Sequence, residues 1–212
     1  MKYASVNKYN LSAQQIQDKA NEINAELGRF DPEKRHLFQI EVPNHMFQAY
    51  LYTSLGITLS LSPEEADTIF WDASSPGEAT EGIEEFLDYI HEKDIRSGVI
   101  SNISYAGNVV EKRINNILPH HHFEFIIATS EYMYRKPNKR IFELALEMAD
   151  LKNEDVWYIG DNYECDIIGA KNAGIYPIRY TGAIDATNES RHDVQEINNW
   201  KELMSYIENC TD

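Results

Sequence analysis

The first part of the chain shows the spacing of hydrophobic residues that is typical of amphipathic helices. From Ser5 to about Ser74, apolar residues recur three and four positions apart, and each such stretch begins with polar residues. No clear alternation of apolar and polar residues, as in a strand, interrupts them. The stretches 10–27 and 45–57 predict two helices, the first with Ser12 as its N-cap, and a third begins at Ser62, which a proline follows. This pattern predicts a helical region over residues 1–77.

After residue 77 the pattern changes, because short apolar runs rich in β-branched and aromatic residues now alternate with helical spacing. The predicted strands are 97–101, 123–129, 156–160 and 174–180, and the predicted helices are 81–94, 106–118, 138–151 and 165–174. Such alternation is typical of a Rossmann-like parallel sheet covered by helices on both faces. We therefore predict an α/β fold with two domains, a helical one at 1–77 and an α/β core at 78–212.

The composition indicates the class of protein and the cellular compartment in which we expect it. The chain of 212 residues is 42% hydrophobic and 25% charged, which suits a globular protein with one full core. It shows no targeting sequence at its start and no apolar run near the ~20 residues that a membrane helix needs. Two cysteines, Cys165 and Cys210, fit a reducing compartment. We expect a cytoplasmic protein that has no membrane partner.

The charge balance restricts the partners further. The formal net charge is -16, and no cluster of lysine and arginine interrupts it, so nucleic acid is not expected as a partner. An anionic substrate would have to meet local positive charge instead. An isolated lysine beside a strand end therefore draws attention.

Polar side chains follow three of the predicted strands, at the edge where ligands bind in parallel sheets. Ser101 and Asn102 follow one strand, Lys136 comes after the next, and Asp161 and Asp166 follow the third. A hydroxyl and an ammonium suit a phosphate group, and two carboxylates suit Mg²⁺. Taken singly, each residue also fits a structural role, since aspartate is a common turn and N-cap residue.

These segments carry a resemblance to a known family. The stretches GVISN (98–102), SEYMYRKPNKRIF (130–142) and YIGDNYECDIIGAKNAG (158–174) resemble the second, third and fourth motifs of the haloacid dehalogenase-like (HAD) hydrolase superfamily. The resemblance runs from about residue 78 to residue 180. The preceding helical region resembles the helical cap of the C1-type subclass, which closes over the active site.

The resemblance implies roles for these residues. Ser101 would hydrogen-bond the phosphoryl group with help from Asn102, and Lys136 would hold the phosphate and the nucleophile together. Asp161 would be a direct Mg²⁺ ligand, and Asp166 a second ligand or the group that orients the first. The implied cofactor is Mg²⁺, and the implied substrate is a small phosphorylated metabolite.

The first motif of the family, Asp-x-Asp-x-Thr after a central strand, does not occur in these 212 residues. Asp72 comes closest, but no aspartate follows two positions later. Two interpretations stay open. In one, a strand of about a dozen or more residues ahead of Met1 carries the motif and fills the middle of the sheet. In the other, the stretch 2–6 is itself the central strand, with Asn7 and Tyr9 in place of the two aspartates.

The function predicted from these observations is a Mg²⁺-dependent phosphatase acting on a small phosphate monoester through an aspartyl-phosphate. An alternative is a non-catalytic binding or regulatory protein that keeps the fold but lacks the nucleophile. A haloacid dehalogenase is a third reading, which the two aspartates disfavour because that chemistry needs no metal. No glycine-rich dinucleotide or P-loop motif appears in the sequence.

Overall fold

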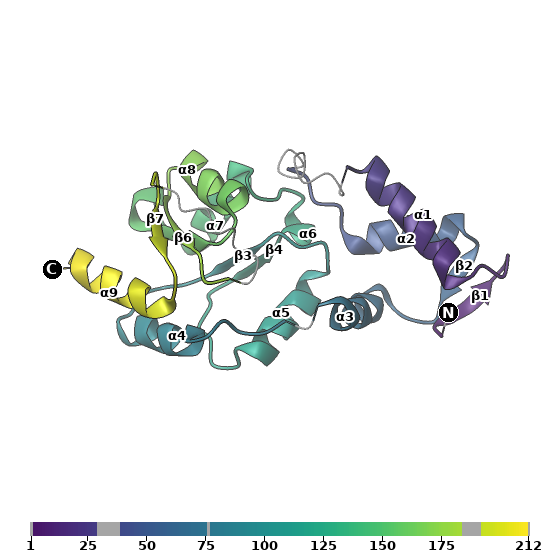
Figure 1. The fold of residues 1–212 in the computed structure, drawn as a ribbon, viewed down its shortest axis with the longest axis horizontal. Coiled ribbons are helices and arrows are strands. Elements are labelled where there is room, and N and C mark those ends of the chain that lie inside the picture. The colour runs from purple at the N-terminus through teal and green to yellow at the C-terminus, as the bar shows by residue number, and fades with distance from the viewer. Residues whose placement is uncertain (1, 29–38, 76, 184–191, 212) are drawn as a thin grey trace.

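A computed structural model of the chain describes residues 2–28, 39–75, 77–183 and 192–211 (Figure 1). Three helices and a pair of short strands come first along the chain, and parallel strands alternating with helices follow. In Figure 1 the first group lies to the right and the second to the left, and α3 of the first group lies beside α5 of the second. The division at residue 77 stays a prediction.

The helices of the first part are α1 (Ala13–Glu26), α2 (Asn44–Ser54) and α3 (Pro63–Ser74). Two of them begin as the sequence predicts. Ser12 caps α1 and Ser62 caps α3, and in each case the side chain three residues on returns a hydrogen bond to the cap. Ala20 and Ile23 of α1 pack against Leu51 of α2 and form a small core of their own.

Two short strands correct the prediction that residues 5–74 are helical throughout. The strands β1 (Ala4–Asn7) and β2 (Ile57–Leu59) form an antiparallel pair beside the helices. Strands of three and four residues are too short to show a clear alternation of apolar and polar positions. The pairing also excludes the interpretation in which residues 2–6 form the central strand of the α/β sheet.

The second part contains every strand and helix that the sequence predicts for it, with boundaries shifted by a few residues. Its strands are β3 (Val99–Ser101), β4 (Ile126–Ala128), β5 (Trp157–Gly160), β6 (Tyr176–Tyr180) and β7 (Gln195–Ile197). Its helices are α4 (Ile83–Glu92), α5 (Gly107–Ile117), α6 (Thr129–Tyr132), α7 (Lys139–Ala149), a 3₁₀ turn η2 (Asn153–Asp155), a π-helix η3 (Tyr163–Ile168), α8 (Gly169–Asn172) and α9 (Trp200–Thr211). The sequence did not predict α6, η2, β7 or α9.

Helices cover both faces of the parallel strands. Helices α4 and α9 pack against β6 and β7 through a core that includes Phe86, Ile178 and Leu203. On the other face, α7 and α8 cover β4 through Ile127 and Phe142. Figure 1 shows α7 and α8 on one side of the strands and α4, α5 and α9 on the other. The observed fold is the mixed α/β fold with parallel sheets that the sequence predicts.

The parallel strands form two separate groups. β3 pairs with β4, and β5 pairs with β6 and β6 with β7, whereas β3 and β5 do not pair with each other. Val99 N donates to Phe125 O beside β4, so the backbone groups of the next residue, Ile100, point away from β4. Among the residues that the structure describes, no strand pairs with the edge of β3 that faces away from β4. We refer to the space beside this edge, between β3 and β5, as the slot.

Among the described residues, none of the helices is both long and apolar enough to cross a membrane.

Candidate active site

The centre of the candidate site is the ammonium group of Lys136, in the loop between α6 and α7. Lys136 is only 9% exposed, and its Nζ donates to three acceptors: Ile100 O at 3.0 Å, the Tyr158 hydroxyl at 2.9 Å and Asp166 Oδ1 at 2.6 Å. These partners come from β3, β5 and η3, so the lysine joins the two strand groups across the slot. A lysine ammonium has three donors and no acceptor, so all of its hydrogen-bonding capacity is in use.

The charge state of this cluster follows from its surroundings. Burial acts to lower the pKa of Lys136, but the charges and hydrogen bonds of Tyr158 and Asp166 outweigh it and hold that pKa above its ordinary value. Burial raises the pKa of the Tyr158 phenol, so the hydroxyl stays protonated at neutral pH. Lys136 therefore stays a charged ammonium, paired with the Asp166 carboxylate, at the carboxyl ends of the strands.

Asn102 fixes the main chain of the same lysine. Its side chain accepts from Lys136 N at 2.8 Å and donates to Lys136 O at 2.8 Å. This two-point contact ties the residue that follows β3 to the loop that follows β4. The role of Asn102 in phosphate binding stays a prediction, and the contact shown is with the main chain of Lys136.

The turn after β5 places Asp166. Its Oδ2 accepts from Asn162 N at 2.9 Å, while the Asn162 side chain caps η3 by accepting from Cys165 N at 2.8 Å. A Cβ atom on Gly160 would overlap Asp166 Cγ, so only glycine leaves room for this carboxylate. The strand, the glycine and the π-helix together hold Asp166 against Lys136.

Ser101 and Asp161 flank this cluster along the chain. Ser101 is the last residue of β3, between Ile100 and Asn102, which both contact Lys136. Asp161 stands between Gly160, which packs on Asp166, and Asn162, which donates to it. Both are partly buried. The structure thus joins Lys136, Asp166 and Asn102 directly, and it sets Ser101 and Asp161 next to their contact residues.

The donor set of the turn after β5 is compatible with Mg²⁺. Among the described residues, no three or more His, Cys, Asp and Glu side chains come together as a metal-binding group. Mg²⁺, however, usually keeps several waters and takes only one or two carboxylates from the protein. Asp166 Oδ2 accepts one backbone N–H, which leaves it further acceptor capacity, and Asp161 is the adjacent carboxylate. Asp161 and Asp166 therefore fit the ion by their chemistry.

Tyr158 is the site residue that sequence reasoning missed. Its hydroxyl lies 2.9 Å from Lys136 Nζ and 3.4 Å from Asp166 Oδ1, and its ring packs edge-on against Phe142. The available signal was a phenol in the strand that leads into Gly160. Because tyrosine is common in strands, this signal did not separate it from a packing residue.

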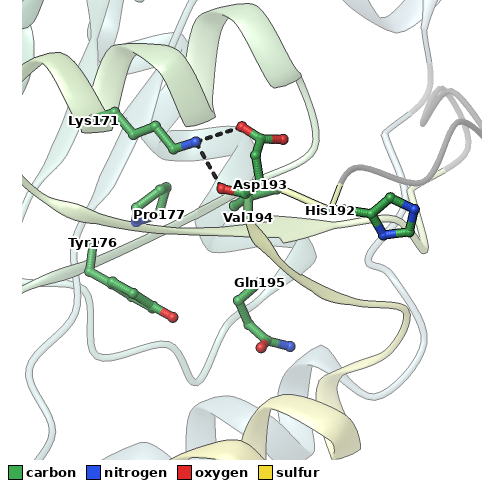
Figure 2. A pocket seen from close by; sticks show the side chains of 7 residues that line it. All are labelled: Lys171, Tyr176, Pro177, His192, Asp193, Val194 and Gln195. Atoms are coloured by element: carbon green, nitrogen blue, oxygen red, sulfur yellow. Dashed lines mark hydrogen bonds and ion pairs between the residues drawn. The ribbon is translucent and has the colours of Figure 1, made fainter.

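An open groove lies elsewhere, beside β6 and β7. It has a volume of about 520 Å³ and is lined by Lys171, Tyr176, Pro177, His192, Asp193, Val194 and Gln195 (Figure 2). Lys171 Nζ donates to Asp193 Oδ2 at 2.8 Å and Tyr163 donates to the same oxygen at 2.6 Å, and these bonds lower the pKa of Asp193 to about 2. None of the predicted site residues lines this groove.

Comparison with known proteins matches this architecture. The family model described as haloacid dehalogenase-like hydrolase matches residues 71–179. The human haloacid dehalogenase-like hydrolase domain-containing protein 3 is 28% identical over 123 residues, which cover 55% of this chain and 46% of that protein. Glyceraldehyde 3-phosphate phosphatase of Methanothermobacter thermautotrophicus is 36% identical over 88 residues, 41% of this chain and 37% of that protein.

Solved structures agree at the level of the fold. The 2-haloacid dehalogenase from Pseudomonas syringae superimposes with a TM-score of 0.63 at 19% identity, covering 95% of this chain and 83% of that one. The HAD-hydrolase YfnB from Bacillus subtilis, bound to magnesium, gives a TM-score of 0.55 at 14% identity. The match covers 93% of this chain and 84% of that one. By contrast, the chain spans about half the length of the curated relatives that it matches first.

Proposed function

Because the chain belongs to the haloacid dehalogenase-like hydrolase family, we propose that it forms the site of a Mg²⁺-dependent phosphatase for small phosphate monoesters. The observation that carries the proposal is the buried ammonium of Lys136, held by Asp166 at 2.6 Å at the carboxyl ends of β3 and β5. In a chain with a net charge of -16, a buried cation at this edge is where an anionic group would be stabilised. Phosphatase relatives support the reaction class.

Each residue has a task in this proposal. Ser101 donates its hydroxyl to a phosphoryl oxygen, and Asn102 keeps Lys136 in place through the main chain. Lys136 neutralises negative charge on the phosphoryl group. Its donor to Ile100 O is the one free to change partner, because a strand entering the slot would supply a backbone N–H to that carbonyl.

Mg²⁺ would be held by Asp161 and Asp166 together with water and a phosphoryl oxygen. When bound, it would stabilise the negative charge that develops on the transferring phosphoryl group. The likeness to a magnesium-bound structure supports the fold that would hold it, not the ligands themselves. Asp166 would then serve both the ion and Lys136 with its two oxygens.

The nucleophile is the part that these 212 residues do not supply as Asp-x-Asp. We propose that it comes from an aspartate on a strand set in the slot. Its carboxylate oxygen would bond to phosphorus while the bond from phosphorus to the ester oxygen breaks, and the alcohol would leave with a proton from a second acid. Water would then hydrolyse the acyl phosphate and regenerate the carboxylate.

A second function, phosphate binding without turnover, is favoured by one specific observation. The sequence contains no Asp-x-Asp pair that could supply the nucleophile. In this form the protein would be a binding or regulatory member of the family. Dehalogenation ranks below both, because the likeness to a dehalogenase structure shows the fold alone.

Three further parts of the proposal rest on sequence. We place the protein in the cytoplasm, with a small phosphorylated metabolite as its ligand and neither nucleic acid nor a membrane as a partner. Residues 1–77 would form the helical cap domain and 78–212 the α/β core.

Hydrolysis of p-nitrophenyl phosphate with Mg²⁺ tests the proposal in a form of the protein that carries an Asp-x-Asp strand for the slot, with Lys136→Ala and Lys139→Ala compared in that form at equal concentration. Lys139 lies three residues away, is exposed and pairs with Glu143 on its own helix. We expect Lys136→Ala to abolish turnover and Lys139→Ala to keep it. Activity that survives Lys136→Ala would overturn the proposed site. No turnover in any variant, with phosphate still bound, would support the binding function.

A further inference from the structure

The loop from Asn102 to Ala106, which leaves β3 and enters α5, is held almost entirely by groups outside itself. Thr129 Oγ1 accepts from Ile103 N at 3.0 Å, and Ser130 N donates to Ile103 O at 3.1 Å. The Ser130 hydroxyl also donates to Tyr105 O at 2.6 Å. These contacts come from the first two residues of α6, directly after β4. They fix one side of the loop to the core.

The other side of the loop is fixed by the helices of the first part. Asn44, the first residue of α2, donates its backbone N–H to Ser104 O at 2.7 Å. Asp67 of α3 accepts from Ala106 N at 3.0 Å through Oδ2. Ala106 is the N-cap residue of α5, so this bond fixes the main chain at the point where the loop enters the helix.

Asp67 is itself held in place. It is 1% exposed, and its Oδ1 accepts from Asn44 Nδ2 at 2.5 Å and from Gln48 Nε2 at 3.0 Å. A carboxylate so deeply buried needs hydrogen-bond donors on its oxygens, and all three donors here come from α2 and the loop. The carboxylate therefore ties α2 and α3 to the loop.

We propose that Asp67 is a positioning residue for the candidate site. Asp67 fixes the backbone of the loop that begins with Asn102, and Asn102 fixes the main chain of Lys136. The helices of the first part therefore help determine the geometry of the phosphate rim, by which we mean Ser101, Asn102 and Lys136. The inference rests on the proposed function where it concerns phosphate. The contact between Asp67 and the loop stands without it.

Two variants of Asp67 separate the carboxylate's role from its bulk. Asp67→Ala leaves Ala106 N, Asn44 and Gln48 without their acceptor. Asp67→Asn keeps an oxygen for Ala106 N, while Asn44 and Gln48 can turn their side-chain amides to offer oxygens to its NH₂ group. Glu64→Ala is the matched control, because it removes one exposed negative charge from the same helix.

Amide hydrogen exchange of the full chain tests the proposal. The readout is the change in exchange rate at Ile103 and Ala106 relative to that at Ile127 in β4. A lost hydrogen bond to a buried N–H predicts a relative increase of about tenfold or more in Asp67→Ala. We expect Asp67→Asn to restore most of the protection and Glu64→Ala to leave it unchanged. An equal increase at all three amides would show a merely structural role and overturn the proposal.

Binding of inorganic phosphate in the presence of Mg²⁺ gives the second readout. We expect Asp67→Ala to bind about tenfold more weakly than the parent chain and Asp67→Asn to bind nearly as well. Unchanged affinity in Asp67→Ala would contradict a link to the rim. If the parent chain binds no phosphate, the proposed function fails, and hydrogen exchange alone decides the role of Asp67.

Discussion

At the scale of single residues, the candidate site is a buried cation with three acceptors. The sequence identified Lys136, Asp166 and Asn102 because each follows a strand in a parallel sheet, where polar side chains gather at one edge. It could not reveal that Lys136 and Asp166 form an ion pair. It also could not reveal that the Tyr158 hydroxyl and the carbonyl of Ile100 are the other two acceptors of the ammonium. Every residue has a backbone carbonyl and tyrosine is common in strands, so residue identities alone do not predict these contacts.

Removing the buried ammonium should destabilise the protein. Lys136→Met keeps the stem but leaves Asp166 without its counter-charge, and breaking a buried pair in this way typically costs about 3–5 kcal/mol. Urea unfolding at pH 7 measures this difference in the free energy of unfolding between the parent and Lys136→Met. Lys139→Met, in an exposed pair, should change the free energy of unfolding by under about 0.5 kcal/mol.

The pH dependence of this difference has a definite sign. The pKa of Lys136 is raised in the folded protein, so its contribution is complete below the unfolded value of about 10.4 and is lost only as the pH rises through the folded value. The difference between parent and Lys136→Met should therefore stay constant from about pH 7 to pH 10. A difference that vanishes by pH 9 would contradict the raised pKa.

The Tyr158 hydroxyl can be tested without disturbing the ring. Tyr158→Phe keeps the edge-on contact with Phe142 but takes one acceptor from the Lys136 ammonium, at a cost of about 1–3 kcal/mol. Tyr89→Phe is the control, since among the described residues the Tyr89 hydroxyl donates one long hydrogen bond, 3.4 Å to Met204 O. Equal stability of the two variants in chemical denaturation would show that the hydroxyl is not part of the cluster.

At the scale of elements, the sequence predicted helix starts better than short strands. Ser12 and Ser62 were recognisable because capping depends on local chemistry. β1 and β7 were missed because three or four residues, partly polar, carry no period that separates them from loops. The π-helix after β5 was predicted only as an ordinary helix, since so short a segment has too few residues for its spacing to differ from that of an α-helix.

The turn between β5 and η3 should not tolerate a side chain at residue 160. Gly160→Ala places a Cβ atom on Asp166 Cγ, so the carboxylate must move away from Lys136. We expect a loss of about 1–3 kcal/mol in stability, as in other overpacked sites, and weaker Mg²⁺ binding by calorimetry. In Gly77→Ala, the atoms nearest to the added Cβ are the ends of the Arg113 and Ile117 side chains, which can shift, and the result should be close to the parent. A Gly160→Ala variant with parent-like stability and Mg²⁺ affinity would contradict this packing.

At the scale of the whole molecule, the main finding is that the parallel strands fall into two groups with a slot between β3 and β5. The sequence predicted the order of strands and helices, because each βα pair carries its own pattern. The absence of Asp-x-Asp pointed to the missing centre of the sheet, but only the structure shows the edge of β3 with which no described strand pairs, and the side chains of Lys136 and Tyr158 that reach Ile100 O there.

A strand supplied to the slot should both stabilise the fold and provide the nucleophile. We predict that fusing an apolar strand that ends in Asp-x-Asp-x-Thr ahead of Met1 raises the thermal midpoint and gives turnover of p-nitrophenyl phosphate. The matched control carries Asn in place of the first Asp of that strand. It should keep the gain in thermal stability and lose the turnover. A fusion that changes neither property would show that the slot does not accept a strand.

Calorimetric titration of the chain with inorganic phosphate in the presence of Mg²⁺ tests the central claim most directly, because it does not depend on turnover. The account predicts saturable binding that weakens at least about tenfold in Lys136→Ala and stays unchanged in Lys139→Ala. Equal binding by both variants, or no binding by the parent chain, would contradict the claim that Lys136 and the aspartates after β5 form a phosphate site.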